Sequence, residues 1–471
     1  MEVLQRTANR GSIATGAAYE IENSLKFEAD NSEELQRNVS TAGSRQTATV
    51  SMWIKRTELG AAQYLFTYGN TDNDDGRTLA RFQSDDTLRI MGGNTTWRNT
   101  NRVFRDTSAW YHIVIAFDTT QSTANDRIKL YINGVQETSF STTNNPSLNG
   151  TLGLNFQKQV IGYNSIDGGS YFSGYMTEIV HQDGTASTPT EFGETDSDTG
   201  IWIPKNVDGV ASGTNGFYLD FEDSSNLGND ASGGTDFTLN NITSIDQATD
   251  TPTNNFCTIN ALVDNGFAIW SLTEGGTRGP NTGEGNTSVG TFAVSKGKWY
   301  WEGVTTAATG LNYWKWGITR VDMQQGYSHD PGTGSAWYSA EETFLTQTGP
   351  GSESPAYDTG ITSYTVGDIW SISLNCDVNP YEITLRFNNS VPGTAANNTD
   401  RSVGTFASAD AVMPYFFLMN SSSDNTWHNF GNPFIATLSG GNTDENGYGD
   451  FKYAPPSGYY ALCTKNLAEY G

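Results

Sequence analysis

Hydrophobic and polar residues alternate with a period of two along many short segments of this chain, which is the spacing of β-strands with one buried face. In residues 47–56 (TATVSMWIKR), Val50, Met52 and Ile54 fall on one face, between more polar neighbours. The same pattern predicts further strands at 24–29, 63–69, 87–93, 159–164 and 173–183. No amphipathic helical stretch of any length interrupts them.

Residues 110–117 (WYHIVIAF) and 127–134 (RIKLYING) predict a hairpin. The run from Ile113 to Phe117 has no polar interruption, which suits a strand covered on both faces. In the second segment apolar and polar residues alternate, and Asn133-Gly134 favours a tight turn. We therefore expect two antiparallel strands of a sandwich, the first central and the second nearer the surface.

The second half of the chain repeats this theme. Residues 296–304 and 313–319 predict aromatic strands, and residues 367–390 contain two alternating segments that end in Asn388-Asn389. Between the halves, residues 183–200 and 244–256 are rich in Thr, Asp and Ser, as connectors are, with one helical turn expected within TPTEFGE. The pattern indicates two sandwich-like units.

Length and composition agree with this organisation. A chain of 471 residues exceeds one ordinary hydrophobic core, and 51 glycines suit many turns between short strands. The predicted fold class is all-β, with two antiparallel β-sandwiches in tandem. The predicted parts are an N-terminal arm (1–22), a first sandwich (23–200), a connecting β segment (201–260), a second sandwich (261–436) and a C-terminal tail packed on it (437–471). Whether 201–260 completes the first sandwich or forms a small domain stays open.

Charge narrows the possible partners. Lys and Arg total 26 against 52 Asp and Glu, for a formal net charge of -26. Such a surface repels nucleic acid and anionic membranes, and leaves neutral sugars, cations and proteins, although solubility alone can also explain the acidity. Three widely spaced cysteines argue against a disulfide framework. The N-terminal residues lack an apolar signal region, and no stretch of about 18 apolar residues predicts a membrane span.

Several segments resemble known families. WYHIVIAFD with RIKLYINGV, and SLKFEADNSEELQRN with ATVSMWIKR, resemble the laminin-G-like domain of the concanavalin A-like superfamily over residues 23–200, and GFYLDFEDSSNLGNDASG resembles a further segment of that type. KGKWYWEGV, YWKWGI, GDIWSISLNCD, ITLRFNN and the pair MPYFF and TWHNFG resemble, in that order, the strands of a SPRY domain over 261–436. Both resemblances imply antiparallel sandwiches that bind ligands through loops.

This domain order, followed by the tail GNTDENGYGDFKYAPPSGYYALCTKNL, resembles structural proteins of marine tailed bacteriophages. The resemblance implies a virion protein on the tail or head of the particle, with other virion proteins as partners. It also implies host cell-surface glycan as a ligand and a homo-oligomer, for which a trimer is the usual fibre arrangement. Residues 1–22 would then dock onto the particle.

Catalytic patterns are weak in this sequence. Related glucanases carry Glu-x-Asp-x-x-Glu on one strand, and this string is absent. Asp220 and Glu222 share a face but fall at a strand end before a polar loop, and the four histidines form no HExxH motif. There is no Walker loop and no Gly-x-Ser-x-Gly elbow. We expect no enzymatic activity, with a polysaccharide depolymerase as the weaker alternative.

Ligand-binding candidates combine an aromatic ring with polar side chains in loop-like segments, because a sugar needs both stacking and hydrogen bonds. Residues 92–102 offer Trp97, Arg98 and Asn99, and residues 328–339 offer Trp337 and Tyr338. In so aromatic a chain, either tryptophan could instead pack within its own domain. Trp97 is the better candidate because polar residues surround it.

Calcium is the one cofactor that the sequence suggests, at NTDNDDGR, through Asp72, Asp74 and Asp75. The loop fails the EF-hand pattern, but oxygen-rich loops can bind calcium without it, and Asp167 in SIDGG is a weaker candidate. The favoured reading is a non-enzymatic phage virion protein of the tail-fibre or receptor-binding type. The alternative is a purely structural decoration or spacer protein.

Overall fold

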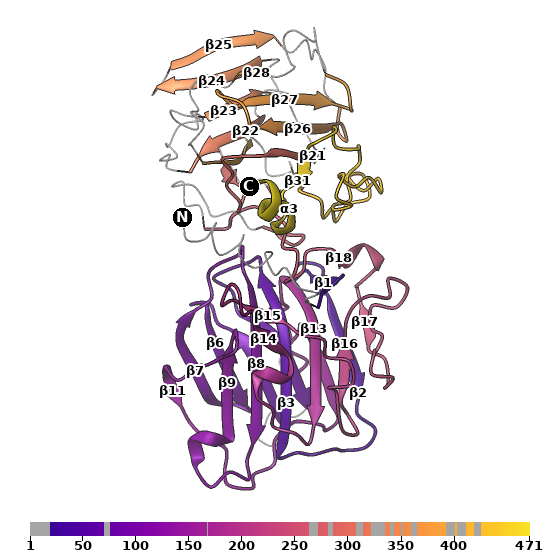
Figure 1. Cartoon of the computed structure of the whole chain (residues 1–471). Coiled ribbons are helices and arrows are strands. Elements are labelled where there is room, and N and C mark those ends of the chain that lie inside the picture. Colours follow the sequence, from indigo (N-terminus) through magenta and orange to yellow (C-terminus); the bar gives the residue numbers. More distant parts are fainter. Residues whose placement is uncertain are drawn as a thin grey trace. The chain divides into compact units, whose positions relative to one another are not determined.

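The computed structural model divides the chain into two compact units, one formed by Ala14–Thr253 and the other containing Asn254–Gly471 (Figure 1). The structure describes residues 19–69, 76–166, 168–262, 272–280, 286–307, 314–321, 335–339, 343–349, 352–358, 365–391, 401–402, 411–418 and 425–471. We call the two parts the first and the second unit and describe each by itself. Within the described residues no helix is long and apolar enough to cross a membrane.

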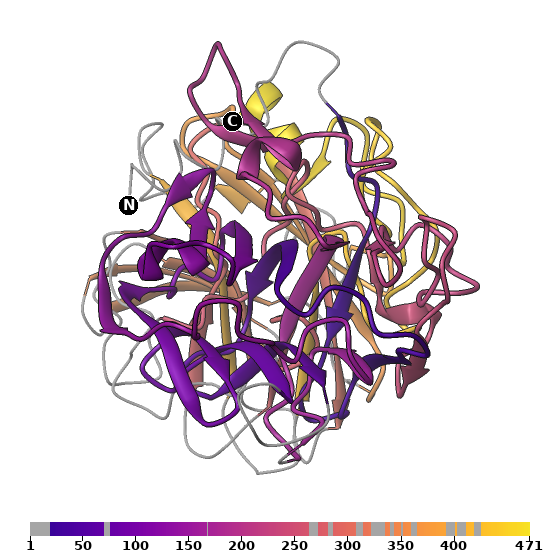
Figure 2. The same ribbon diagram turned by 90° about the horizontal axis from the view of Figure 1, so that it is seen from below.

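Two antiparallel sheets build the first unit. In the order of hydrogen-bonded neighbours, sheet A contains β10 (Val135–Gln136), β9 (Ile128–Ile132), β8 (Trp110–Asp118), β3 (Thr47–Arg56), β13 (Gly174–Asp183), β1 (Ser24–Phe27) and β18 (Gln247–Ala248), with β16 (Phe217–Leu219) paired to β13. Sheet B contains β11 (Phe140–Thr143), β7 (Thr95–Val103), β6 (Thr87–Gly92), β5 (Arg77–Phe82), β4 (Gln63–Gly69), β12 (Lys158–Ile161), β2 (Glu34–Asn38) and β17 (Thr238–Asn240). The turns that join these strands face the viewer in Figure 2.

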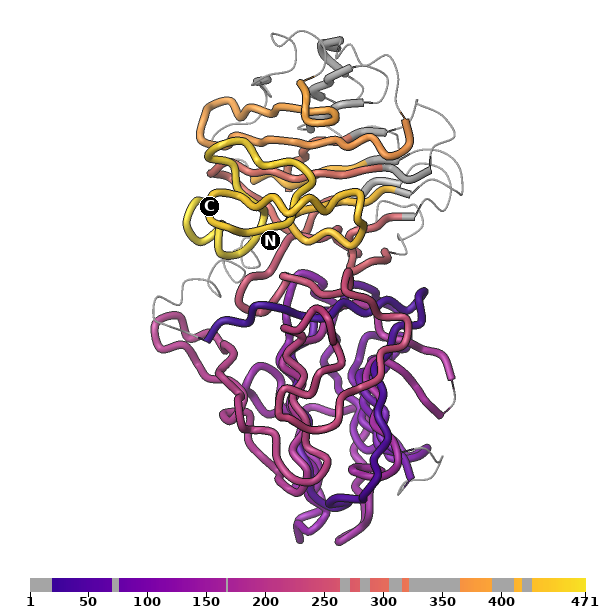
Figure 3. The backbone as a smooth tube through the Cα atoms, turned by 90° about the vertical axis from the view of Figure 1, so that its right-hand side faces the viewer, coloured from indigo at the N-terminus to yellow at the C-terminus, as the bar shows by residue number. Residues whose placement is uncertain are grey.

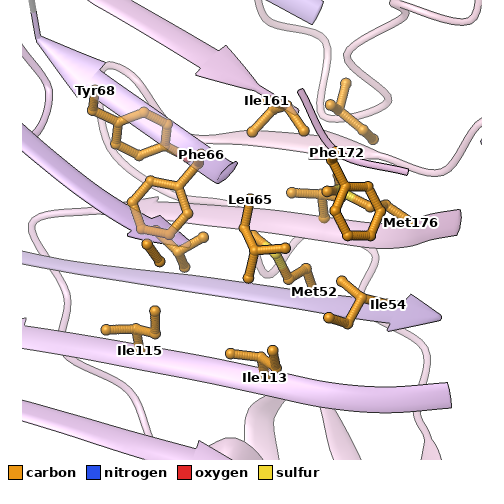
Figure 4. Packing of buried hydrophobic residues seen from close by; sticks show 14 of the residues in the cluster. Met52, Ile54, Leu65, Phe66, Tyr68, Ile113, Ile115, Ile161, Phe172 and Met176 are labelled. Carbon is orange, nitrogen blue, oxygen red and sulfur yellow. The ribbon is translucent and has the colours of Figure 1, made fainter. Parts of the chain in front are cut away.

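The core of the first unit lies between the two sheets (Figure 4). Met52 and Ile54 of β3 point toward Leu65 and Phe66 of β4. Alternation places the two β3 residues on one face, whereas the consecutive Leu65 and Phe66 both face inward because of a β-bulge. All four are buried. This is the packing expected when two sheets cover each other's apolar faces.

The predicted hairpin is confirmed. β8 and β9 pair antiparallel from Ile113 opposite Ile132 to Phe117 opposite Ile128. Asn133 and Gly134 adopt positive φ of 49° and 77°, as a tight hairpin turn requires. β8 is covered on both sides, since Ile113 packs in the core while Val114 packs beneath a segment on the outer face of sheet A.

That covering segment follows β13 and includes the 3-10 helix η2 (Pro189–Glu191) and the hairpin β14 (Gly193–Thr195) and β15 (Trp202–Pro204). η2 is the helical turn predicted within TPTEFGE. Val207 and Phe192 of the segment pack on Val114 and Val180. The outer face of sheet A is therefore largely apolar and buried around β8 and β13.

Residues 201–253 complete the first unit and are not a separate domain, which settles the question that the sequence left open. β16, β17 and β18 add to sheets A and B, and Figure 3 shows this stretch of chain lying along the first unit. Three buried ion pairs hold the stretch: Arg37–Asp230 at 3.0 Å, Lys26–Asp246 at 2.8 Å and Lys55–Asp250 at 2.6 Å. Two further 3-10 turns, η1 (Ala124–Arg127) and η3 (Ser244–Asp246), join strands.

The second unit also contains two sheets. One has the order β19 (Arg278–Pro280), β30 (Asn425–Asn429), β21 (Lys298–Ala307), β26 (Ile369–Asn375), β27 (Glu382–Phe387) and β28 (Arg401–Ser402), with β31 (Tyr460–Ala461) pairing in parallel with β21. The other has the order β20 (Asn286–Val289), β29 (Val412–Leu418), β22 (Trp314–Arg320), β23 (Ser335–Ser339), β24 (Thr343–Gly349) and β25 (Ser352–Asp358). The predicted hairpin within 367–390 is β26 and β27, followed by Asn388 and Asn389 at positive φ.

The C-terminal segment packs on the second unit and ends in the short helix α3 (Thr464–Tyr470). Glu302 of β21 holds it, because its carboxylate accepts hydrogen bonds from the backbone N–H groups of Lys452 (2.8 Å) and Tyr453 (2.9 Å). Glu302 is fully buried, and burial raises its pKa to about 7. The all-β prediction with two antiparallel sandwich units is thus confirmed.

Candidate ligand-binding face

The predicted loop around Trp97 is a strand. Trp97, Arg98 and Asn99 all belong to β7, so the loop placement is wrong. Thr96 lies opposite Met91 and Arg98 opposite Ile90, which leaves Trp97 as the extra residue of a β-bulge. The Trp97 side chain is 2% exposed and packs in the core. A ring buried to this degree cannot stack on a sugar.

Arg98 is also buried, and its guanidinium is committed to the protein itself. It donates to the carbonyl oxygens of Trp97, Asn144 and Ile128 and to Oδ1 of Asn145. Burial lowers the pKa of Arg98, since desolvation penalises the charged form. Arg98 thereby links β7 to the start of β9 and to the residues that follow β11.

Asn99 lies on the opposite, outer face of sheet B, because the bulge at Trp97 shifts the alternation of β7. The strand pairing places Asn99 opposite Arg89, Arg89 opposite Arg81, and Arg81 opposite Tyr64. Four neighbouring strands thus contribute one cross-strand row of polar side chains. We call this row of Tyr64, Arg81, Arg89 and Asn99 the arginine row.

A second bulge, in β4, orients Tyr64 outward. The register shifts between Tyr64 and Phe66, so that Leu65 and Phe66 both join the core. Tyr64 instead packs with Leu79 and Met91, which come from the neighbouring strands β5 and β6. The arginine row is therefore bordered by a small apolar strip.

Each arginine of the row is held by a neutral partner. Arg81 Nη1 donates to the hydroxyl of Tyr64 at 2.6 Å and its guanidinium lies 5.1 Å from the centre of that ring. Arg89 Nε donates to Asn99 Oδ1 at 3.0 Å. Burial lowers the pKa of Arg89, and the charge of Arg81 lowers it further. Among the described residues neither guanidinium has a carboxylate within ion-pair distance.

A pair of tyrosines follows β12 near the same face. The rings of Tyr163 and Tyr171 stack with 4.2 Å between their centres and 16° between their planes, and both side chains are partly exposed. Thr67 of β4 donates its hydroxyl to the carbonyl oxygen of Tyr163 at 2.9 Å, and the N–H of Tyr64 donates to the carbonyl oxygen of Ser170 at 3.3 Å. The loop that carries the stack therefore runs along β4, beside the arginine row.

The remaining predicted site residues are Trp337, Tyr338 and the candidate calcium ligands. Trp337 and Tyr338 lie in β23, opposite Gly317 and Trp316 of β22, and not in a loop. The candidate calcium ligands Asp72, Asp74 and Asp75, and also Asp167, fall outside the described residues. Within the described ranges no three His, Cys, Asp or Glu side chains are arranged to hold a metal ion.

The histidines that the structure describes are packed residues, as predicted for His112 and His428. His112 is stacked between Trp53 and Trp202. Its Nδ1 accepts a hydrogen bond from the indole N–H of Trp202, and its Nε2 is hydrogen-bonded to Ser51 Oγ, both at 2.9 Å. His181 and His428 are buried as well. Desolvation lowers the pKa of each of these three histidines to about 3, which keeps them neutral at pH 7.

Asp220 and Glu222, the carboxylate pair considered for catalysis, lie near a third acid, Glu178. Asp220 Oδ1 accepts from the N–H of Glu222 at 3.1 Å, which is a local turn bond. Glu178 is 3% exposed and occupies a bulge of β13 at φ 51°. It accepts hydrogen bonds from the hydroxyls of Tyr218 (2.8 Å) and Tyr19 (3.4 Å). Burial, together with the charges of Asp220 and Glu222, raises the pKa of Glu178 to about 8.

The sequence signals for the arginine row were present but indirect. Arg81 and Arg89 alternate with apolar residues on β5 and β6, and this pattern predicts only that they point away from the core. Their juxtaposition depends on strand register, and Tyr163 with Tyr171 depends on the path of a loop. Neither juxtaposition can be predicted from the pattern of one strand by itself.

Comparison with known proteins agrees with this fold. Residues 28–191 match a laminin-G-type family described as the concanavalin A-like lectin/glucanases superfamily. The first unit is therefore a laminin-G-like, concanavalin A-like β-sandwich. No curated protein matches the sequence.

Similar solved structures include both types of sandwich. Domains LG4-5 of the mouse laminin alpha1 chain share 10% identity over 85% of this chain and 84% of that one, with a TM-score of 0.30. A SAP-like pentraxin from Limulus polyphemus shares 19% identity over 36% of this chain and 80% of that one, with a TM-score of 0.26. A human SPRY domain shares 15% identity over 38% of this chain and 98% of that one, with a TM-score of 0.24.

Proposed function

We propose that this chain is a non-enzymatic saccharide-binding protein whose ligand lies on the outer face of sheet B. One observation carries the proposal: Arg81 and Arg89 lie side by side on that face, and the loop that carries the Tyr163–Tyr171 stack contacts β4 of the same sheet. A saccharide site needs an apolar or aromatic surface and a few oriented polar groups. The family description of residues 28–191, which names lectins, supports the same function.

The absence of catalysis is part of this proposal, since the same family description also names glucanases. Glycoside hydrolysis requires two carboxylates on either side of one bond. The arginine row supplies guanidinium, phenol and amide groups instead. The nearby Asp85 accepts hydrogen bonds from the N–H (3.1 Å) and hydroxyl (2.6 Å) of Thr87. Incubating the protein with host polysaccharide and finding new reducing ends would contradict this part.

The decisive experiment is a glycan array with the purified full chain, run with calcium and again with a chelator. We expect selective binding that Tyr171→Ala weakens. The matched control is Tyr470→Ala, which disrupts another stacked tyrosine pair, Tyr460–Tyr470, in the second unit (4.0 Å between centres, 10° between planes). Silence of the folded wild-type protein across a broad array would reject the proposal. Binding lost in chelator would add calcium to it.

We further propose that the protein is displayed on a phage particle, as a tail-fibre or receptor-binding module that binds other virion proteins and assembles as a homo-oligomer. The resemblance of the domain order and tail to phage structural proteins supports this, and several copies would strengthen weak glycan binding. Tyr19 and Ile21 at the end of the predicted arm hydrogen-bond to Glu178 and Thr253 of the first unit, so the test deletes only residues 1–18. This deletion should abolish incorporation into particles and leave the two units folded. Full incorporation of the deleted protein would contradict the docking role.

A purely structural decoration role is the second candidate. It predicts that particles carrying Tyr171→Ala adsorb to host cells as well as the wild type does. Unchanged adsorption together with a silent glycan array would favour this role over the first.

A further inference from the structure

We infer that the ligand of the outer face is an anionic saccharide, whose carboxylate or sulfate group lies against Arg81 and Arg89. This inference rests on the proposed function and names the class of sugar. It starts from the cross-strand register, which sets two arginines directly opposite each other on β5 and β6.

Facing like charges destabilise an antiparallel sheet, because directly opposite side chains on one face lie about 5 Å apart at Cβ. The charge of Arg81 indeed lowers the pKa of Arg89. The chain carries 52 acidic residues against 26 basic ones, so acidic partners are abundant in the sequence. Both described guanidiniums are nevertheless held by uncharged groups, Tyr64 and Asn99. An anion bound between them would relieve the repulsion.

The two side chains retain unused donors. A guanidinium has five N–H donors in a planar fork that fits carboxylate and sulfate oxygens. Arg81 uses Nη1 for the Tyr64 hydroxyl, while its buried Nε has no hydrogen-bond partner. Leaving a buried donor of a charged group unsatisfied is costly. The rest of the Arg81 side chain is partly exposed, so a ligand oxygen can accept from the N–H groups of the fork that no described residue uses.

The row is also oriented before a ligand arrives, which lowers the entropy lost on binding. The ring of Tyr64 lies beneath the Arg81 guanidinium, at 5.1 Å. Asn99, which accepts from Arg89, is itself fixed because its Nδ2 donates to Ser141 Oγ at 2.9 Å. Two β-bulges, at Leu65 and Trp97, set the outward direction of Tyr64 and Asn99.

The aromatic side chains near the arginine row favour a saccharide over a free anion as the ligand. A free inorganic anion would need only the arginines, whereas the partly exposed Tyr163–Tyr171 stack, whose loop contacts β4 of the same sheet, offers aromatic surface to a sugar. Because the net charge of the chain is -26, long-range attraction of an anionic glycan is absent. Affinity must then come from short-range contacts at the arginine row.

The test is a glycan array that contains matched neutral, carboxylated and sulfated saccharides, with Arg81→Gln, Arg89→Gln and the double variant. We expect the wild type to prefer acidic glycans, each single variant to bind them about 10-fold more weakly, as for loss of a charge-assisted hydrogen bond, and the double variant to lose the preference. Lys129→Gln is the charge-matched control, because Lys129 lies on β9 of sheet A in an exposed pair with Asp126. Its binding should equal that of the wild type.

The outcomes separate the inference from the proposed function. Selective binding to neutral glycans alone, unchanged in the double variant, would overturn the inference and leave saccharide binding intact. Silence on all glycans would overturn both. Arg89→Lys distinguishes charge from geometry, since lysine retains the charge without the planar fork; carboxylated glycans should bind this variant more weakly than the wild type.

Discussion

The guanidinium of Arg37 and the carboxylate of Asp230 form a buried ion pair at 3.0 Å, although 193 positions separate them in the chain. The Arg37 guanidinium packs against the rings of Phe217 and Phe237, 4.8 Å from the centre of each, and donates to Gln159, Asn215 and Thr235 as well. The pair thus connects β2 to the stretch that completes both sheets. We therefore expect the Arg37–Asp230 pair to contribute to the stability of the first unit.

Asp230→Ala should destabilise the first unit strongly. The substitution leaves the Arg37 charge buried without its partner, which typically costs about 3–5 kcal/mol. It also removes the acceptor for the N–H of Tyr218 on β16. Urea denaturation followed by intrinsic fluorescence would measure the loss. Asp126→Ala, which breaks the exposed Lys129–Asp126 pair, is the control, and equal midpoints for the two variants would contradict the role of Asp230.

Glu178→Gln should stabilise the protein at pH 8 and have little effect at pH 4. Burial raises the folded-state pKa of Glu178 to about 8 from an ordinary 4.5, so the folded state favours the protonated acid. For an acid with a raised pKa, the stability is present at low pH and is lost as pH rises from 4.5 through 8. Each pKa unit corresponds to ~1.4 kcal/mol, so the gain should amount to a few kcal/mol.

Thermal unfolding of wild type and Glu178→Gln across pH 4 to 9 checks this dependence. Glu191→Gln, on the exposed turn η2, serves as the control. If the difference in melting temperature between wild type and Glu178→Gln is the same at every pH, the prediction is wrong. The surroundings of Glu178 would then not shift its pKa; these are Tyr19, Tyr218, Asp220 and Glu222.

Glu302→Ala should loosen the C-terminal segment from the second unit. The carboxylate of Glu302 accepts from the N–H groups of Lys452 and Tyr453 and from the Tyr300 hydroxyl at 2.8 Å, and alanine leaves these donors unsatisfied. Hydrogen exchange of residues 451–461 should accelerate at least 10-fold, while exchange in the first unit stays unchanged. Glu469→Ala near the C-terminus is the control, and protection equal to wild type in Glu302→Ala would refute the prediction.

Trp97→Ala should lower the stability of the first unit. Any loss of glycan binding should follow only from this loss of folded protein. Trp97 fills the core beside Gly92, where an added Cβ would lie 1.9 Å from the indole ring, so the packing there leaves no space. Removing a buried tryptophan costs about 3–5 kcal/mol. Chemical denaturation should show this loss, whereas the glycan preference of the remaining folded protein should match the wild type. A stable Trp97→Ala variant that loses binding would restore the tryptophan as a ligand residue.

Strand positions were predictable because alternation is a local property. Residues 47–56 and 63–69 are strands β3 and β4 at the predicted bounds, and the Asn133-Gly134 hairpin turn is where its dipeptide placed it. Trp97 shows where prediction from neighbouring residues alone fails. Polar neighbours on both sides of Trp97 predict a loop, yet β7 buries Trp97 through a bulge and turns Asn99 outward.

Composition and period alone determine that this protein is all-β, that it has more than one core, and where most strands lie, since backbone geometry imposes a period of two on any half-buried strand. Strand order, register and bulges depend on contacts between residues far apart in the chain. Only the tertiary structure therefore decides that residues 201–253 belong to the first unit, that Arg81 faces Arg89, and that Arg98 is buried while Asn99 is turned toward the outer face. A one-residue bulge reverses the face of every side chain beyond it.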